Sequence, residues 1–160
     1  MIAISLIDVE ERPTVGVRRQ VRMTELSDFF ARVFDDVAAQ VERAGARIAG
    51  APFARYRGVP TDVADVEAGF PLTEPWSGDG EDLVAGTLPA ARAIEAIHQG
   101  GYDALPETYT QIEQWAVEHD VRTQADMWEV YEAGPQSDPD PATWRTRIIW
   151  PVARTEVEGA

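Results

Sequence analysis

The chain contains no cysteine and no lysine, and only two of its 160 residues are histidine. Without cysteine it can form neither disulfides nor thiolate zinc sites. With His98 and His119 as the only histidines, a histidine-rich metal site is excluded too. No lysine is present to form a Schiff base. We therefore expect no metal, no cofactor and no covalent amine chemistry.

Long apolar runs are also missing from the sequence. No stretch approaches the roughly 18 apolar residues that a membrane-spanning helix needs. Residues 1–12 lack the basic start and the long apolar run of a signal peptide. The sequence therefore predicts a cytoplasmic protein with no membrane contact.

Acidic residues outnumber basic ones in this sequence. Asp and Glu number 28 against 14 basic residues, which gives a formal net charge of −14. Such a surface repels phosphate backbones and anionic lipids, so we expect no direct binding of nucleic acid or membranes. Cationic partners or ligands are favoured instead. The length and a 44% share of hydrophobic residues fit one domain over residues 1–160.

Two kinds of periodicity divide the chain into helices and strands. Apolar residues at three- and four-residue steps predict two helices, and alternation predicts strands. Thr24 is expected to cap the first helix, and Gly45 to lie near its end. The second helix is expected over residues 104–119. The predicted strands cover residues 3–8, 14–23, 51–58, 65–72, 83–90, 91–100, 127–134 and 143–153.

The two halves of the chain look like a duplication. FARY followed by AGFPL in the first half matches WEVY followed by IIWPV in the second. Phe53 then aligns with Trp128, and Phe70 with Trp150. The repeat predicts two antiparallel sheet units, each with one helix, and a pocket between the halves.

The most informative string is MWEVYEAGP, which contains Glu129. On a strand, Glu129 and Tyr131 share one face, because successive side chains alternate. One interpretation is that this face is exposed to solvent, as antiparallel sheets allow. The other is that Glu129 is an acid on the floor of a pocket, held for a cationic or hydrogen-bonding ligand.

Five tryptophans are a high count for a chain of this size. Aromatic faces around a carboxylate suit flat or cationic organic ligands. Aromatic residues near the ends of strands and helices are the better pocket candidates, namely Trp144, Trp76 and Tyr102. The core is expected to hold Trp115, Trp128 and Trp150.

Other motifs of catalysis are missing. No string matches a phosphate-binding loop, a dinucleotide fingerprint or a serine-hydrolase elbow. His98 and His119 are interpreted as surface or hydrogen-bonded structural histidines. The Pro- and Asp-rich residues 134–141 are interpreted as a turn and not as a calcium loop.

Several strings together resemble the GyrI-like, or AraC-type effector-binding, domain family. They are EERPTVGVRRQVRMTELSDFF, PFARY with DVEAGFPL, HQGGYDALPETYTQIEQWAVEH, WEVYEAGP and RIIWPV, in the family's order. The resemblance covers nearly the whole chain. It implies an α+β fold of the SHS2-duplication type, in which duplicated βαββ units form a curved antiparallel sheet with two main helices and a central ligand cleft.

The same resemblance implies roles for particular residues. Glu129 corresponds to the acid that recognises cationic ligands in the drug-binding members. Tyr131, on the same strand face, is expected to line the cleft. The other residues expected at the cleft are Trp144, Tyr102, Phe30 and Phe34.

The sequence departs from the family at Arg147, where an acid is common. We expect Arg147 to lower the negative potential of the pocket, or to pair with Glu129 or Glu67. No helix-turn-helix precedes the domain in this sequence, so transcriptional regulation by this polypeptide alone is not expected.

Three functions remain open from the sequence. The first is a stand-alone small-molecule binder of the multidrug-sensor type. The second is a hydrolase of cyclopropane-bearing genotoxic natural products, with Glu129 as general base and Tyr102 or Tyr131 as hydrogen-bond donor. The third is a protein–protein inhibitor, as the gyrase-inhibiting members of the family are, which would have a protein partner.

Overall fold

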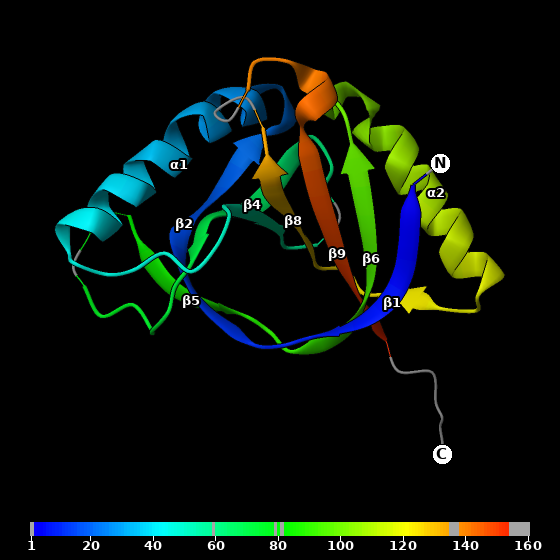
Figure 1. The fold of residues 1–160 in the computed structure, drawn as a ribbon, viewed down its shortest axis with the longest axis horizontal. Helices are drawn as coiled ribbons and strands as arrows, with labels where there is room; N and C mark the ends of the chain where they lie inside the picture. Colours follow the sequence, from blue (N-terminus) through cyan, green and yellow to red (C-terminus); the bar gives the residue numbers. More distant parts are fainter. Residues whose placement is uncertain (1, 59, 79, 81, 135–137, 154–160) are drawn as a thin grey trace. The chain divides into compact units, whose positions relative to one another are not determined.

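The chain forms two compact units, each with one long helix and an antiparallel sheet (Figure 1). We call them the α1 unit, Glu10–Ala90, and the α2 unit, which comprises the described residues up to Val9 and from Ala91. The structure is a computed structural model. It describes residues 2–58, 60–78, 80, 82–134 and 138–153.

The α1 unit contains four strands and the longer helix. Its elements are β2 (Arg12–Arg22), α1 (Leu26–Arg43), β3 (Phe53–Tyr56), β4 (Val63–Pro71) and β5 (Val84–Leu88), with a 3-10 turn over Met23–Glu25. The strands lie in the order β5–β2–β4–β3, and all neighbours are antiparallel.

The α2 unit repeats this plan. Its elements are β1 (Ala3–Val9), β6 (Ala91–Gln99), α2 (Leu105–Glu118), β7 (Arg122–Thr123), β8 (Met127–Ala133) and β9 (Arg145–Ala153), with 3-10 turns over Tyr102–Ala104 and Pro141–Thr143. The sheet order is β1–β6–β9–β8, again antiparallel, and the short β7 pairs with β9.

The predicted duplication is confirmed by these two sheet orders. In the α1 unit β2 leads into α1, and β4 returns to pair with β2. In the α2 unit β6 leads into α2, and β9 returns to pair with β6. A fourth strand forms one edge of each sheet. It is β5, next to β2, in the α1 unit, and β1, next to β6, in the α2 unit. The expected α+β fold of repeated βαββ units is therefore correct, while the cleft expected between the halves stays a prediction.

The helix α1 packs as its apolar spacing predicts. Its buried side chains are Val33, Phe34, Val37 and Val41. The ring of Phe34 meets that of Phe70 edge to face, with centroids 6.1 Å apart. Phe70 comes from β4, so α1 covers the β4 face that also carries Val66 and Ala68, both fully buried.

Some local predictions were wrong. Thr24 does not cap the first helix, because Met23–Glu25 form a 3-10 turn and α1 begins at Leu26 without a side-chain cap hydrogen bond. The short strand β7 was not expected at all, since two residues carry no periodicity. Gly45, as expected, follows the end of α1, with the positive φ of 76° that glycine adopts readily.

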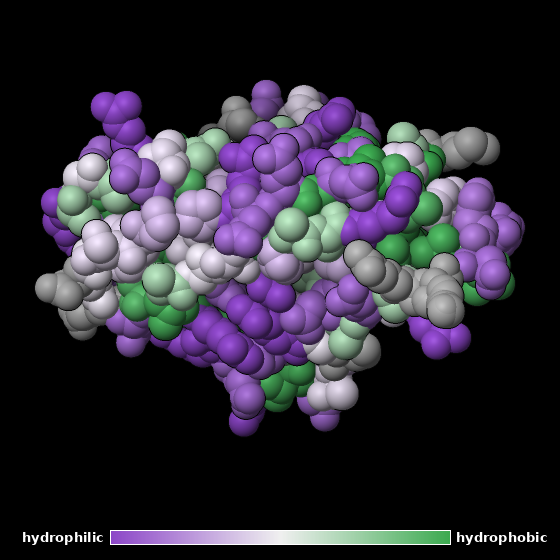
Figure 2. Space-filling view, turned by 90° about the horizontal axis from the view of Figure 1, so that it is seen from below, coloured by the Kyte–Doolittle hydropathy of each residue, from purple (hydrophilic) through white to green (hydrophobic). Residues whose placement is uncertain are grey.

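In the described part of the chain, no helix is both long enough and apolar enough to cross a membrane. Figure 2 shows hydrophilic residues over much of the face in view, as expected for a chain with a net charge of −14.

Candidate functional site

Glu129 lies in the middle of β8 and is buried, with 5% of its surface exposed. In the register of the sheet it stands opposite Ile148, and Tyr131 stands opposite Thr146. Directly opposed residues share a face, and Tyr109 of α2 contacts Glu129 on that face. The carboxylate therefore points into the layer between the sheet and α2. Of the two interpretations left open by the sequence, the solvent-facing one is wrong.

Two tyrosine hydroxyls hold the buried carboxylate. The hydroxyl of Tyr131 donates to Oε1 of Glu129 at 2.7 Å. The hydroxyl of Tyr109, from α2, donates to Oε2 in a short hydrogen bond. Each carboxylate oxygen thus accepts one hydrogen bond from a phenol hydroxyl. In the described part of the chain, no arginine forms an ion pair with Glu129.

Burial sets the proton affinity of this acid. Removal from water raises the pKa of Glu129 above its usual value of 4.5, while the hydrogen bonds from Tyr109 and Tyr131 and the charge of His98 lower it. The net pKa shift is upward, because burial disfavours the charged form more than the neutral hydroxyls favour it. Such a group can hold a negative charge for a ligand, or accept a proton more readily than an ordinary glutamate does.

His98 lies near the end of β6, on the same face of the sheet. Its register partner is Thr146, which is itself the partner of Tyr131. The imidazole is buried. Its Nε2 lies 2.8 Å from the carbonyl oxygen of Gly101, and its Nδ1 lies 2.7 Å from Oγ1 of Thr108 on α2. His98 is therefore the hydrogen-bonded histidine that the sequence suggested, and it also lies within electrostatic range of Glu129.

An aromatic cluster adjoins the carboxylate. The ring of Tyr102 lies 6.0 Å from that of Tyr131 and 5.0 Å from that of Trp144. Burial, and then the charge of Glu129, raise the pKa of Tyr102. The structure thus brings together four of the seven predicted ligand-binding residues, and all three of the predicted catalytic ones, within the α2 unit.

The turn before β9 positions Trp144. The carboxylate of Asp140 accepts the amide of Ala142 at 3.1 Å, and the indole nitrogen of Trp144 donates to the carbonyl of Asp138 at 2.7 Å. The amide of Gly100 also donates to the carbonyl of Trp144 at 2.9 Å, which joins this turn to the segment that carries Tyr102. These contacts agree with the turn that the sequence indicated, while residues 135–137 of that segment lie outside the described residues. Among the described residues, no group of three acids or histidines could hold a metal ion.

The other three predicted site residues lie in the α1 unit. Phe30 and Phe34 are stacked on α1 with ring centroids 5.8 Å apart. Trp76 is half-buried in the segment after β4. Their participation in the Glu129 site stays a prediction.

Sequence reasoning missed Tyr109. Tyr109 falls within the helix expected over residues 104–119, but no role was expected for its hydroxyl. Only the packing of α2 on β8 shows that its hydroxyl meets an acid. A tyrosine on the inner face of a helix next to a strand with an internal glutamate is the signal that was available.

The pairing of Arg147 with Glu129 or Glu67 is not found in the described part of the chain, while its effect on the potential of the pocket stays a prediction. Its Nε donates to Glu95 of β6 at 2.5 Å. Arg147 alternates with Ile148, so it lies on the sheet face opposite Glu129. Glu67, the other partner considered, is held by Arg57. The guanidinium of Arg147 therefore does not neutralise the buried acid of β8.

Comparison with protein families gives one match over almost the whole chain. Residues 3–153 match the model of the GyrI-like small molecule binding domain. A search among curated proteins finds no match.

Solved structures share the fold at low sequence identity. The EcmrR C-terminal domain superposes with a TM-score of 0.81 at 20% identity, covering 97% of this chain and 99% of that one. EcmrR in a DNA complex gives 0.84 at 22% identity and covers 96% of this chain, which spans only 58% of the EcmrR chain. SAV2435 bound to tetraphenylphosphonium gives 0.68 at 14% identity, covering 94% of each chain. A hydrolase from Listeria innocua superposes with a TM-score of 0.63 at 12% identity, covering 94% of this chain and 91% of that one.

Proposed function

The chain belongs to the GyrI-like small-molecule-binding domain family, and from that premise we propose that its Glu129 site binds lipophilic cations with aromatic groups. The observation that carries this proposal is a buried carboxylate held by two phenol hydroxyls and by no guanidinium among the described residues. Its negative charge is therefore not cancelled by an ion pair.

Physical reasons connect this arrangement to cations. A charge in a partly dry environment acts over several ångströms, so a ligand cation gains energy without touching the carboxylate. The rings of Tyr102, Tyr131 and Trp144 offer faces for cation–π and stacking contacts. The solved structure of SAV2435 with tetraphenylphosphonium shows that a protein of this fold takes such a compound.

The test is thermal unfolding of the purified protein with increasing tetraphenylphosphonium. A ligand that binds the folded state raises the melting temperature, and above the dissociation constant the rise grows with the logarithm of the ligand concentration. We expect concentration-dependent stabilisation of the wild type. Glu129→Gln should bind at least roughly tenfold more weakly, because losing the charge of one binding partner costs about 1.5–3 kcal/mol.

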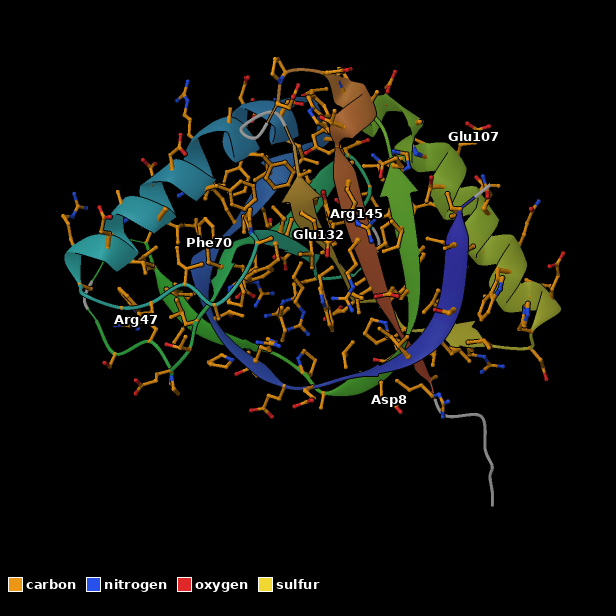
Figure 3. The ribbon with its side chains drawn as sticks, in the orientation of Figure 1. Asp8, Arg47, Phe70, Glu107, Glu132 and Arg145 are labelled. Atoms are coloured by element: carbon orange, nitrogen blue, oxygen red, sulfur yellow. The ribbon has the colours of Figure 1, made fainter. Side chains whose placement is uncertain are left out.

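Glu132→Gln is the matched control. It removes the same charge from the same strand, but Glu132 is exposed and pairs with Arg145 at 2.7 Å (Figure 3). Its affinity for the cation should stay within about twofold of wild type, since exposed charges are screened. Equal losses in both variants would mean that net charge, and not the buried site, attracts the ligand.

Hydrolysis is the second candidate, and one observation favours it. Burial raises the pKa of Glu129, which suits a general base, and a phenol already donates a hydrogen bond to it. In that reaction Glu129 would take a proton from water as the oxygen bonds to a strained cyclopropane carbon, and the opened carbon would receive a proton. Mass spectrometry of a cyclopropane-bearing alkylator incubated with the protein tests this. Consumption of the compound by wild type but not by Glu129→Gln would support the enzyme.

A further inference from the structure

His98 has a second buried side chain as a neighbour in the sheet. Its register partner Thr146 is fully buried, and its Oγ1 has no hydrogen-bond partner among the described residues. Thr146 stands opposite Tyr131, whose hydroxyl donates a hydrogen bond to Glu129. A row of polar groups therefore crosses from His98 on β6 to the acid on β8, beneath α2. His98 and Glu129 are the imidazole and the carboxyl group of this row, and its other members are hydroxyls.

The hydrogen bonds of His98 fix its position but leave its charge free to change. A carbonyl oxygen only accepts, so Nε2 carries a hydrogen toward Gly101. Nδ1 faces the hydroxyl of Thr108, which can donate to a neutral imidazole or accept from an imidazolium by rotating. The ring can therefore gain or lose a proton without moving and without losing either hydrogen bond.

The surroundings of His98 contain one buried charge. On β8 this is Glu129, and the other facing groups, Tyr131 on β8 and Thr108 on α2, are uncharged at neutral pH. The nearby acids on the connecting turn and on α2, Asp103 and Glu107, are exposed to solvent, which screens them. β1 adds no group, because its pairing with β6 ends at Ile97.

We propose that His98 is a specificity-determining residue of the Glu129 site, which releases its proton when a cationic ligand binds. This inference rests on the proposed function. A protonated His98 offsets the carboxylate, and the site is then close to neutral and suits uncharged ligands. A neutral His98 leaves the negative charge uncompensated, and the site favours cations.

The consequence is reciprocal. If a proton on His98 weakens the binding of a cation, the bound cation weakens the binding of that proton by the same factor. Affinity for a cation is therefore higher when His98 is neutral than when it is protonated. Affinity for a neutral ligand of similar shape shows no such difference from this residue.

The experiment is nitrogen-15 NMR of protein with labelled histidine, at a pH of about 6.5, near the ordinary midpoint of histidine. The chain has only His98 and His119, so each ring is resolved and reports its own protonated fraction. The probes are tetraphenylphosphonium and the neutral triphenylphosphine oxide. His119 is exposed at the end of α2 and stacks on Trp115, which makes it the internal control.

We expect saturating cation to lower the protonated fraction of His98 on the order of threefold, because the bound charge adds to a site on the same face of the sheet. His119 should not change, and the neutral oxide should leave both rings as they were. Without ligand, Glu129→Gln should lower the protonated fraction of His98 as well. An unchanged His98 in that variant would overturn the inference.

A conservative variant separates charge from structure. In His98→Gln the amide can still donate to Gly101 and accept from Thr108, but it cannot ionise. At a pH of about 8.5, where an ordinary histidine is neutral, its cation affinity should lie within about twofold of wild type. A loss of more than about tenfold there would show a purely structural role and overturn the proposal.

The outcomes also separate this inference from the proposed function. If the cation stabilises the protein in a Glu129-dependent way but His98 keeps its protons, this inference alone fails. If the cation does not bind at either pH, the proposed function fails and the inference fails with it.

Discussion

Each unit buries one glutamate in its sheet, and the two carboxylates are satisfied differently. In the α1 unit, Glu67 is 3% exposed and its Oε1 lies 2.6 Å from Nη2 of Arg57. In the α2 unit, Glu129 is 5% exposed and accepts only the phenols of Tyr109 and Tyr131 in the described part of the chain. The first is an ion pair, and the second is a charge solvated by neutral hydroxyls.

The two acids also lie on different faces of their sheets. Glu67 alternates with Val66 and Ala68, whose face is covered by α1, so it lies on the face away from its helix. Glu129 lies on the face covered by α2. Gly86 leaves the room that Glu67 occupies, since a Cβ there would lie 2.7 Å from Oε2. The duplicated fold therefore does not duplicate the acid.

The ion pair marks Glu67 as the structural acid of the two, and Glu129 as the acid that can still attract a cation. A carboxylate already neutralised by a guanidinium at close range has little net attraction left for a cation. A carboxylate held by hydroxyls keeps most of its field, at a cost in stability. The same unit that retains the unneutralised charge also holds the Tyr102 and Trp144 rings beside it.

The largest effect is expected from breaking the ion pair of the α1 unit. Arg57→Met should lower the free energy of unfolding by about 3 kcal/mol, because it removes the short ion pair of the buried Glu67. Urea unfolding measures the change. The control Arg145→Met breaks the exposed pair with Glu132, and should cost less than about 1 kcal/mol. Equal costs for the two variants would remove the distinction between the two kinds of acid.

An intermediate effect of opposite sign is expected at Glu129. Because burial raises its pKa, the folded state holds the proton more tightly than the unfolded state does. The contribution of Glu129 to stability is therefore greatest below its usual pKa of 4.5, and is lost as the pH rises through the raised folded pKa. Glu129→Gln removes this loss and should stabilise the protein at neutral pH by about 1 kcal/mol.

Unfolding curves across this pH range check that prediction. The stability difference between Glu129→Gln and wild type should grow with pH and then level off. Glu132→Gln, which removes an exposed carboxylate from the same strand, is measured alongside as the matched variant. A difference for Glu129→Gln that shrinks as the pH rises would mean that the folded state favours the ionised form.

The smallest effects are expected at two buried threonines, one in each unit. Thr14 and Thr146 are at most 1% exposed, and their hydroxyls have no hydrogen-bond partner among the described residues. Thr14→Val and Thr146→Val remove an unsatisfied polar group of similar shape, so each should be neutral or stabilising by up to about 1 kcal/mol. Thermal unfolding measures this, and a clear loss in either variant would show that its hydroxyl is satisfied in solution.

The sequence was a good guide where periodicity decides structure. The apolar spacing of Val33, Val37 and Val41 placed α1, and the alternation around Glu129 placed that acid and Tyr131 on one face. The aligned strings FARY and WEVY indicated the duplication. These features depend on neighbouring residues, which a sequence shows directly.

The missed features depend on residues that are distant in the chain. Tyr109 meets Glu129 across 20 positions, and Arg147 meets Glu95 across 52. Strand register decides the pair of Arg147 and Glu95, because a shift of one residue would move Arg147 to the other face. The packing of α2 on β8 decides the contact of Tyr109 with Glu129. The cap at Thr24 failed for a local reason, because a 3-10 turn precedes α1 and displaces the start of the helix.

The most direct test of the unneutralised carboxylate is a calorimetric cycle with two ligands and two proteins. Tetraphenylphosphonium and neutral triphenylphosphine oxide are titrated into wild type and Glu129→Gln at a pH of about 8. We predict that the substitution weakens the cation at least about tenfold and changes the neutral ligand less than about twofold. Equal changes for both ligands would contradict the account, because Glu129 would then act through shape and not through charge.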